Sequence, residues 1–159
     1  MIKIRCGVFE TNSSSVHSVV VANHVPAEER DYNRYYSNGG QYGRFSTETC
    51  DDIASRLDYL WQAVLDNEYL SKDENDAFSA SWWKEAIGNV LPEATLIEDY
   101  DNGYIDHGGE YALMLEEMHA DPDLISMFLL NGESRVFMSS DEDYTEPDYP
   151  DCDYIEYGN

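Results

Sequence analysis

Residues 9–18 read Phe-Glu-Thr-Asn-Ser-Ser-Ser-Val-His-Ser, a polar stretch between two apolar runs. Before it, apolar residues alternate with other residues over positions 2–8, which is the two-residue period of a β-strand. After it, residues 16–21 are rich in valine, a β-branched residue that favours strands. The polar stretch therefore predicts a hairpin loop, or a crossing between two neighbouring strands.

This polar stretch has two interpretations. Asn and Ser side chains hydrogen-bond to nearby backbone in turns, so the composition is that of an ordinary turn. His17 is then a strand residue that either faces solvent or packs in the core with its polar groups satisfied, and Glu10 is a solvated charge. Alternatively, the polar side chains converge on a small anion or a carbonyl, and His17 acts as a general base. These side chains are Glu10, Asn12, Ser13, Ser14, Ser15 and His17. The sequence lacks the Gly-x-Ser-x-Gly pattern of a hydrolase nucleophile.

Residues 7–18, Gly-Val-Phe-Glu-Thr-Asn-Ser-Ser-Ser-x-His-Ser, resemble the N-terminal motif of a family of small uncharacterised proteins from bacteriophages and mobile elements, mainly of Gram-positive bacteria. The resemblance continues in three shorter stretches: Gly-Gln-Tyr-Gly-Arg-Phe at 40–45, Asp-Tyr-Leu-Trp at 58–61 and Tyr-Ile-Asp-His at 104–107. It thus covers roughly residues 4–107.

The chain departs from this family in the middle motif. Where relatives carry glutamates, this sequence has Gln41 and Phe45, so an acidic role there does not transfer. The resemblance implies an origin in a phage or mobile element, and it brings no established activity with it.

The charge is distributed unevenly along the 159 residues. Residues 1–50 hold five basic and five acidic residues, whereas residues 51–159 hold four basic and 28 acidic residues, so the net charge of −24 lies entirely in the second part. Such a field repels nucleic acid and anionic membranes and attracts basic protein surfaces. A halophilic adaptation would spread the charge evenly, which the neutral N-terminal third argues against.

The C-terminal residues 141–159 are the most acidic segment, with no basic residue. The carboxylates assigned to partner binding there are Asp141, Glu142, Asp143, Glu146, Asp148, Asp151, Asp153 and Glu156. An extended chain of this length spans roughly 60 Å, or about one carboxylate per 8 Å, against about one phosphate charge per 1.7 Å of duplex axis. Only together with acidic helix faces would the tail imitate the charge density of a nucleic acid.

Several other classes are disfavoured. Three cysteines without a Cys-x-x-Cys pair suggest neither a disulfide framework nor a zinc site, and they fit the cytoplasm of a host cell. A calcium loop over 99–110 fails because Gly103 and Ile105 each stand one position too early. No apolar run approaches the roughly 20 residues that span a bilayer. We therefore expect no cofactor, no metal and no membrane contact.

The predicted fold is α+β: a single domain over 1–140 followed by an acidic, Tyr-rich tail over 141–159. Its antiparallel sheet combines the N-terminal hairpin, a central hairpin over 96–107 with an Asn-Gly turn, and a strand at 135–138. About four helices cover the sheet. They are predicted over residues 51–70, 73–90, 110–119 and 122–130.

Local signals refine these helices. The first starts from a cap at Thr49 or Asp51, and the last has Asp121 as its cap and Pro122 as its first residue. In the second helix one face is apolar. That face holds Phe78, Trp82, Ala86, Ile87 and Val90.

Charge and resemblance together predict a phage-type acidic protein, similar to a DNA mimic, that binds and inhibits a basic nucleic-acid-handling host protein such as a restriction or CRISPR effector. Direct binding of nucleic acid is not expected. The alternative is a small enzyme or nucleotide-binding protein. Its pocket would join Glu10, Asn12, Ser13 and His17 with Asp106 and His107.

Overall fold

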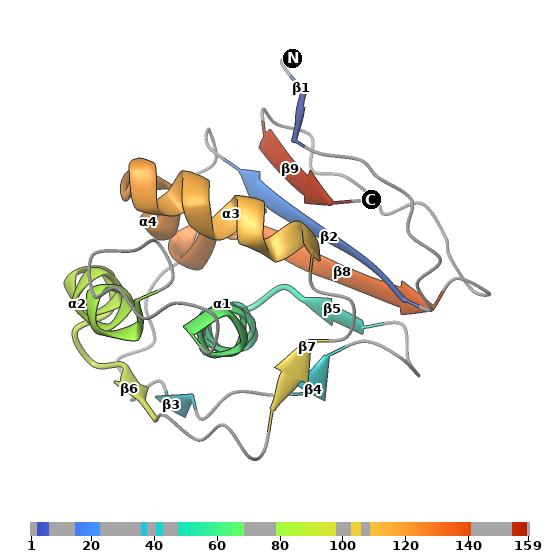
Figure 1. Ribbon diagram of the computed structural model, residues 1–159. Helices are drawn as coiled ribbons and strands as arrows, with labels where there is room; N and C mark the ends of the chain where they lie inside the picture. The colour runs from blue at the N-terminus through green and yellow to red at the C-terminus, as the bar shows by residue number, and fades with distance from the viewer. Residues whose placement is uncertain are drawn as a thin grey trace.

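The computed structural model of the chain describes residues 3–6, 15–22, 36–37, 41–42, 48–68, 79–97, 103–105, 109–140 and 154–158 (Figure 1). Within these ranges an open sheet is covered by helices on one face, and two short strand pairs lie beyond the central helix. The predicted α+β class, with an antiparallel sheet and helical cover, is confirmed.

The main sheet has the strand order β1-β9-β2-β8-β5. Its strands are β1 (Lys3–Cys6), β2 (Ser15–Ala22), β5 (Glu48–Cys50), β8 (Arg135–Ser140) and β9 (Tyr154–Gly158). β2 pairs antiparallel with both β8 and β9, and β8 pairs antiparallel with β5. Val19, Val20 and Val21 of β2 are almost fully buried, which explains why this strand lies in the middle of the sheet.

β9 lies between the two N-terminal strands. Ile155 is opposite Ile4 of β1 in a parallel pairing and opposite Val21 of β2 in an antiparallel one. β1 and β2 therefore run antiparallel but one strand apart, and do not form the predicted hairpin. Ile155 packs against the apolar core, so inserting β9 buries an apolar side chain that a free acidic tail would leave in water.

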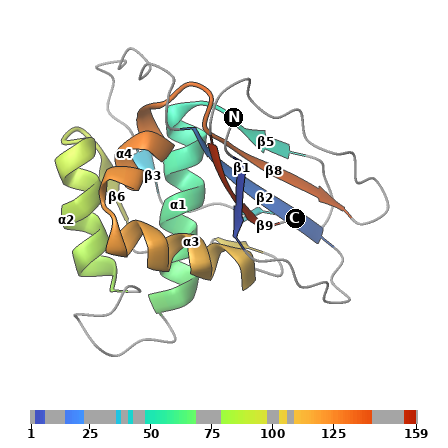
Figure 2. The same ribbon diagram turned by 90° about the horizontal axis from the view of Figure 1, so that it is seen from above.

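Four helices occur in the described residues, and they account for most of the core (Figure 2). They are α1 (Ile53–Glu68), α2 (Ala80–Val90), α3 (Gly109–Ala120) and α4 (Asp123–Leu130). α1 contributes Leu57, Leu60, Trp61 and Val64, all fully buried, at the helical spacing that the sequence predicts. α1 also contacts the other three helices, which makes it the central element of the core.

The first residues of the helices differ from the predicted ones, because local backbone conformation and hydrogen bonds decide where each helix begins. Asp52, one residue later than expected, caps α1 by accepting a 2.8 Å bond from the Ser55 amide. α2 begins at Ala80 because Ser79 has an extended backbone. α4 begins at Asp123, and its first turn is tight, since the Leu124 amide bonds to the carbonyl of Asp121 three residues back.

Two short parallel pairs lie on the side of α1 away from the main sheet (Figure 1). β3 (Tyr36–Ser37) pairs with β6 (Thr95–Leu96), and β4 (Gln41–Tyr42) pairs with β7 (Tyr104–Ile105). β6 and β7 therefore pair with earlier segments and not with each other, unlike the predicted central hairpin. Side chains of α1 fix this arrangement: the Trp61 indole donates to the Ile97 carbonyl, and the Ile105 amide donates to Asp66 at 2.7 Å.

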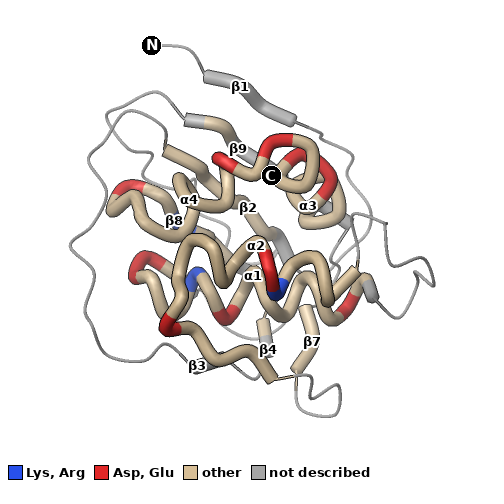
Figure 3. The backbone as a smooth tube through the Cα atoms, turned by 90° about the vertical axis from the view of Figure 1, so that its left-hand side faces the viewer, with Lys and Arg blue, Asp and Glu red and all other residues tan. Residues whose placement is uncertain are grey.

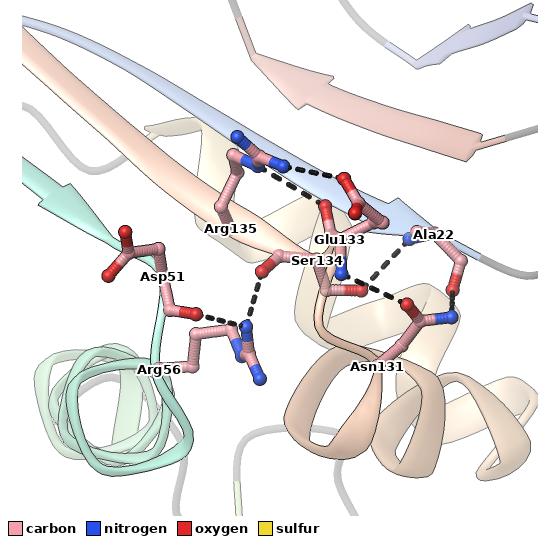
Figure 4. Close-up of polar contacts among 7 residues, drawn as sticks. All are labelled: Ala22, Asp51, Arg56, Asn131, Glu133, Ser134 and Arg135. Carbon is pink, nitrogen blue, oxygen red and sulfur yellow. Dashed lines mark hydrogen bonds and ion pairs between the residues drawn. The ribbon is translucent and has the colours of Figure 1, made fainter. Parts of the chain in front are cut away.

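A buried polar junction joins α1, α4, β2 and β8 (Figure 4). The fully buried guanidinium of Arg56 donates to the carbonyls of Asp51, Leu129 and Ser134. Leu129 lies in the last turn of α4, where carbonyls have no partner within the helix, so a cation is favoured there. Arg56 thereby holds the end of α4 and the start of β8 against α1.

Asn131 and Ser134 complete this junction at the end of β2. The side-chain amide of Asn131 donates to the Ala22 carbonyl at 2.8 Å, and the backbone amide of Ala22 donates to the Ser134 hydroxyl at 2.9 Å. That hydroxyl donates in turn to the Met127 carbonyl. The last residue of β2 is thus hydrogen-bonded to the loop between α4 and β8, and the polar groups that this contact buries have partners.

Candidate functional site

Most residues of the two predicted sites lie outside the described residues. They are Glu10, Asn12, Ser13, Asp106 and His107 of the polar pocket, and Asp141, Glu142, Asp143, Glu146, Asp148, Asp151 and Asp153 of the tail. Two predicted positions are described: His17 in β2 and Glu156 in β9. The structure therefore places one residue from each predicted site.

His17 lies in the core, on the same side of β2 as Val19 and Val21. Only 3% of its surface is exposed. Its Nδ1 atom is 3.4 Å from the hydroxyl of Tyr59, a fully buried residue of α1, and the two rings are 6.1 Å apart. His17 is thus a buried polar residue between the sheet and α1, which is one of the two positions that the turn interpretation allows.

Tyr42 extends this cluster toward β7. Its ring meets Tyr59 edge to face at 5.1 Å, and its hydroxyl donates to Asp58 at 2.6 Å. Burial raises the pKa of the Tyr42 hydroxyl, and the Asp58 carboxylate raises it further. The hydroxyl therefore keeps its proton and is the donor in the hydrogen bond to Asp58. Tyr42 is also the strand partner of Ile105, the residue before Asp106.

His17 is therefore linked to β7 through two neighbouring rings: Tyr59 lies beside His17 and beside Tyr42, and Tyr42 belongs to the strand that pairs with β7. This is the neighbourhood in which the pocket interpretation places Asp106 and His107, two residues outside the described ranges. The chemistry of the described members favours packing over catalysis, because a general base must reach a substrate and the His17 ring is enclosed.

Glu156 stands in a strand and not in an extended tail. It pairs with Arg5 of β1 and with Val20 of β2, so its backbone lies inside the main sheet. Residues 154–158 of the predicted tail are consequently part of the fold. A partner strand cannot pair with the backbone of β9, because β1 and β2 already occupy its two hydrogen-bonding edges.

The helices carry most of the acidic side chains whose exposure is described (Figure 3). Half-buried or exposed carboxylates are Asp51, Asp52, Asp58, Asp66, Glu85, Glu93, Glu116, Glu117, Asp121, Asp123 and Glu133. Among the described lysine and arginine side chains, Arg56 is buried, and only Lys84 and Arg135 reach the surface. Arg135 pairs with Glu133 at 2.8 Å. The described surface is therefore strongly anionic.

A groove of about 410 Å³ lies on this surface between α2 and the start of α4. Its apolar wall is formed by Trp82, Ala86 and Val90 of α2, with Pro122 opposite. Its polar groups come from both helices. They are Glu85, Asn89, Asp123 and Ser126. The groove thus combines an indole, two carboxylates, an amide and a hydroxyl.

Trp82 is held in place by two other rings. Its ring centroid is 5.0 Å from that of Trp83, which is fully buried, and 4.3 Å from that of His119 in the last turn of α3. Contacts at these distances orient aromatic rings. Trp82 therefore forms a fixed, half-buried wall of the groove.

Sequence reasoning missed this groove although it identified part of its wall. It placed Trp82, Ala86 and Val90 on one apolar face together with Ile87. The residues of α2 that are buried are Ala80, Trp83 and Ile87. The available signal was a second face, since positions 82, 85, 86, 89 and 90 follow helical spacing and mix apolar with polar residues. Nothing in the sequence placed that face against α4, more than thirty residues away.

Among the described residues, no group of three His, Cys, Asp or Glu side chains is arranged to hold a metal ion. None of the helices described here combines the length and apolar character needed to cross a bilayer.

The chain matches no protein-family model, no curated protein and no solved structure.

Proposed function

We propose that this protein binds a basic, nucleic-acid-handling protein through its acidic surface and thereby keeps nucleic acid from that partner. The observation that carries the proposal is the charge distribution: a net charge of −24 arises entirely after residue 50. The exposed carboxylates include Glu85, Glu116 and Asp123 on the helices and Asp121 between α3 and α4, and few basic side chains accompany them among the described residues.

The physical argument rests on what a nucleic-acid-binding surface offers. Such surfaces present Lys and Arg side chains that neutralise phosphates, and carboxylates can occupy the same cationic positions. The C-terminal acidic segment alone is too sparse to imitate a duplex, so the proposed binding surface combines the acidic helices with residues 141–153. Electrostatic steering would make association fast and strongly dependent on salt.

The class of partner follows from the resemblance of the N-terminal motif to proteins of phages and mobile elements. Such elements meet restriction and CRISPR effectors in the cytoplasm of the host, and these effectors have basic channels for nucleic acid. We therefore propose an inhibitor of a bacterial defence protein, with the described carboxylates as part of its contact surface.

Affinity capture tests this proposal. The immobilised protein is incubated with bacterial lysate at low and at high salt, and each captured protein is challenged with excess duplex DNA. We expect a basic nucleic-acid-binding protein that is retained at low salt and released by either high salt or DNA. Recovery of no basic protein at low salt would refute the proposal.

A charge-neutralised variant is the matched control for that capture. Glu85→Gln, Glu116→Gln and Asp123→Asn change exposed side chains without changing their size, so the fold is retained. The triple variant should retain less of the partner than the wild type at the same salt. Equal retention would show that the helical carboxylates are not part of the contact surface.

The alternative function, a small enzyme or nucleotide-binding protein, is favoured by one observation. His17 of the polar motif lies within two ring contacts of β7, which precedes Asp106 and His107. Nucleotide binding by the wild type, lost on Asp106→Asn or His107→Ala with unchanged stability, would support this alternative. Absence of binding to any nucleotide would leave His17 a structural residue.

A further inference from the structure

The groove between α2 and α4 contains polar side chains that have no partner among the described residues. The side chains of Glu85 and Asn89 make no hydrogen bond or ion pair with any part of the chain that the structure describes, and the same holds for the carboxylate of Asp123. Glu85 lies in the middle of α2, where a carboxylate gains nothing from the helix dipole. Its charge therefore remains available to a ligand.

The charges of the groove select a cation. Glu85 and Asp123 belong to different helices and line the same space, and Asp121 is exposed beside it. The Lys84 side chain does not line the groove. It extends toward Trp61, because its Nζ atom lies 5.7 Å from the centroid of that ring. An anionic ligand would meet two carboxylates, whereas a cationic one would neutralise them.

The shape and chemistry of the lining favour arginine over lysine. A guanidinium is planar, so it can stack on the indole of Trp82 while its N–H groups donate to carboxylates at its edge. The amide oxygen of Asn89 and the hydroxyl of Ser126 add acceptors. A volume of about 410 Å³ lies within the usual range for small-ligand pockets and admits a long side chain.

We propose that this groove is the subsite that receives an arginine side chain of the basic partner, stacked on Trp82 and bonded to Glu85 and Asp123. The inference rests on the proposed function, because the partner there is a protein whose arginines contact phosphates. It assigns to one place on the anionic surface the contact that fixes how the partner is oriented.

Binding of a hexa-arginine peptide to the full chain tests the subsite. The indole N–H signal of Trp82 reports the groove in NMR spectra, and a hexa-lysine peptide of the same charge is the reference ligand. We expect saturable shifts of the Trp82 signal with hexa-arginine, and weaker binding of hexa-lysine. Equal affinity for the two peptides, or no shift at Trp82, would overturn the proposal.

Two double variants separate the groove from the general anionic field. Glu85→Gln with Asp123→Asn removes both groove carboxylates, whereas Glu93→Gln with Glu116→Gln removes the same charge elsewhere. The groove variant should raise the dissociation constant of hexa-arginine by about tenfold, because charge-assisted hydrogen bonds are lost. The control should raise it by only about twofold. Equal changes in the two variants would refute the subsite.

Failure of the subsite and failure of the proposed function give different results. If lysate capture yields a basic partner whose affinity is the same for both double variants, the groove assignment is wrong and the proposed function stands. If hexa-arginine binds at Trp82 but no basic protein is captured at low salt, the groove is an arginine site and the proposed function is wrong.

Discussion

The junction at the end of β2 and the groove between α2 and α4 use polar residues in opposite ways. In the junction, Arg56 and Asn131 are buried and donate to backbone carbonyls of α4, of β2 and of the loop before β8. In the groove, Glu85 and Asn89 are exposed and make no such bond within the described chain. Polar residues at the junction hold the fold together, whereas those in the groove face outward.

This difference teaches how to separate structural from functional polar residues by their hydrogen-bond partners. A buried polar group must be hydrogen-bonded, so its partners reveal a structural role. An exposed carboxylate beside a fixed aromatic ring needs no partner to be stable. Substitutions should therefore affect stability on the sheet side and binding on the groove side.

The largest effect is expected from removing β9. Truncation that deletes residues 154–159 takes away a strand paired on both sides, with β1 and β2. We expect a loss on the order of 5 kcal/mol or more, comparable with the whole stability of a domain, and hence no cooperative thermal unfolding by circular dichroism.

A milder variant, Ile155→Ala, keeps the strand and removes only an apolar side chain that packs on the core. It should destabilise the fold by about 1–3 kcal/mol. A truncated protein that melts like the wild type would show that β9 does not contribute to the fold, and the C-terminal segment would again be a free acidic tail.

Arg56→Met should give the next largest effect, because it leaves the carbonyls of Asp51, Leu129 and Ser134 without their buried donor. The expected loss is about 3 kcal/mol or more in urea unfolding. Arg135→Met is the matched control. Arg135 is half-exposed and paired with Glu133, so its loss should cost less than about 1 kcal/mol. Similar losses for the two variants would contradict the structural role of the junction.

Two asparagines sharpen the comparison further. Asn131→Ala removes the bond to the Ala22 carbonyl and the acceptor of the Glu133 amide, and should cost about 1–3 kcal/mol. Asn89→Ala changes an exposed groove residue, so unfolding should shift by less than about 0.5 kcal/mol. A larger stability loss for Asn89→Ala would mean that the groove face of α2 is a structural contact.

The smallest effect concerns the pH dependence of stability. Burial raises the pKa of the Asp66 carboxyl, against the opposing effect of its bonds from the Ile105 amide and the Gln62 side chain. The folded state thus binds this proton more readily than the unfolded state. The resulting stability is present below the ordinary pKa of 3.8 and is lost as pH rises through the raised folded-state value.

Asp66→Asn cannot titrate, so its stability relative to the wild type should increase as the pH is raised from about 3.5 to 7. Urea unfolding of both proteins across this range measures the difference. Parallel stability curves for the two proteins would contradict the raised pKa of Asp66. A variant whose stability falls relative to the wild type as pH rises would show that the pKa is lowered in the folded state.

The sequence predicted the parts of the fold that depend on local periodicity. The apolar residues of α1, such as Leu57 and Trp61, repeat at helical spacing, and the valines at 19–21 form a buried strand, so the fold class and the helices could be predicted. The positions of β6, β7 and β9 could not be predicted, because strand pairing is non-local. In particular, residues 154–158 read as acidic tail until Ile155 is seen against the core.

The candidate site was predictable in charge but not in place. The distribution of acidic residues shows that the chain is anionic after residue 50. It also predicted that partner binding lies in the C-terminal segment, but Glu156 of that segment lies in the sheet. The groove depends on two helices that meet only in the folded chain. His17 was identified from its motif, but its burial beside Tyr59 required the packing of β2 on α1.

The central claim is that the acidic surface takes the place of nucleic acid on a basic partner, and a competition measurement tests it most directly. Labelled duplex DNA is bound to a partner captured at low salt, and the full-length protein is added in increasing amounts. The account predicts that DNA is displaced completely, and that the apparent dissociation constant for DNA rises in proportion to the protein added. A ternary complex in which DNA stays bound with unchanged affinity would contradict it.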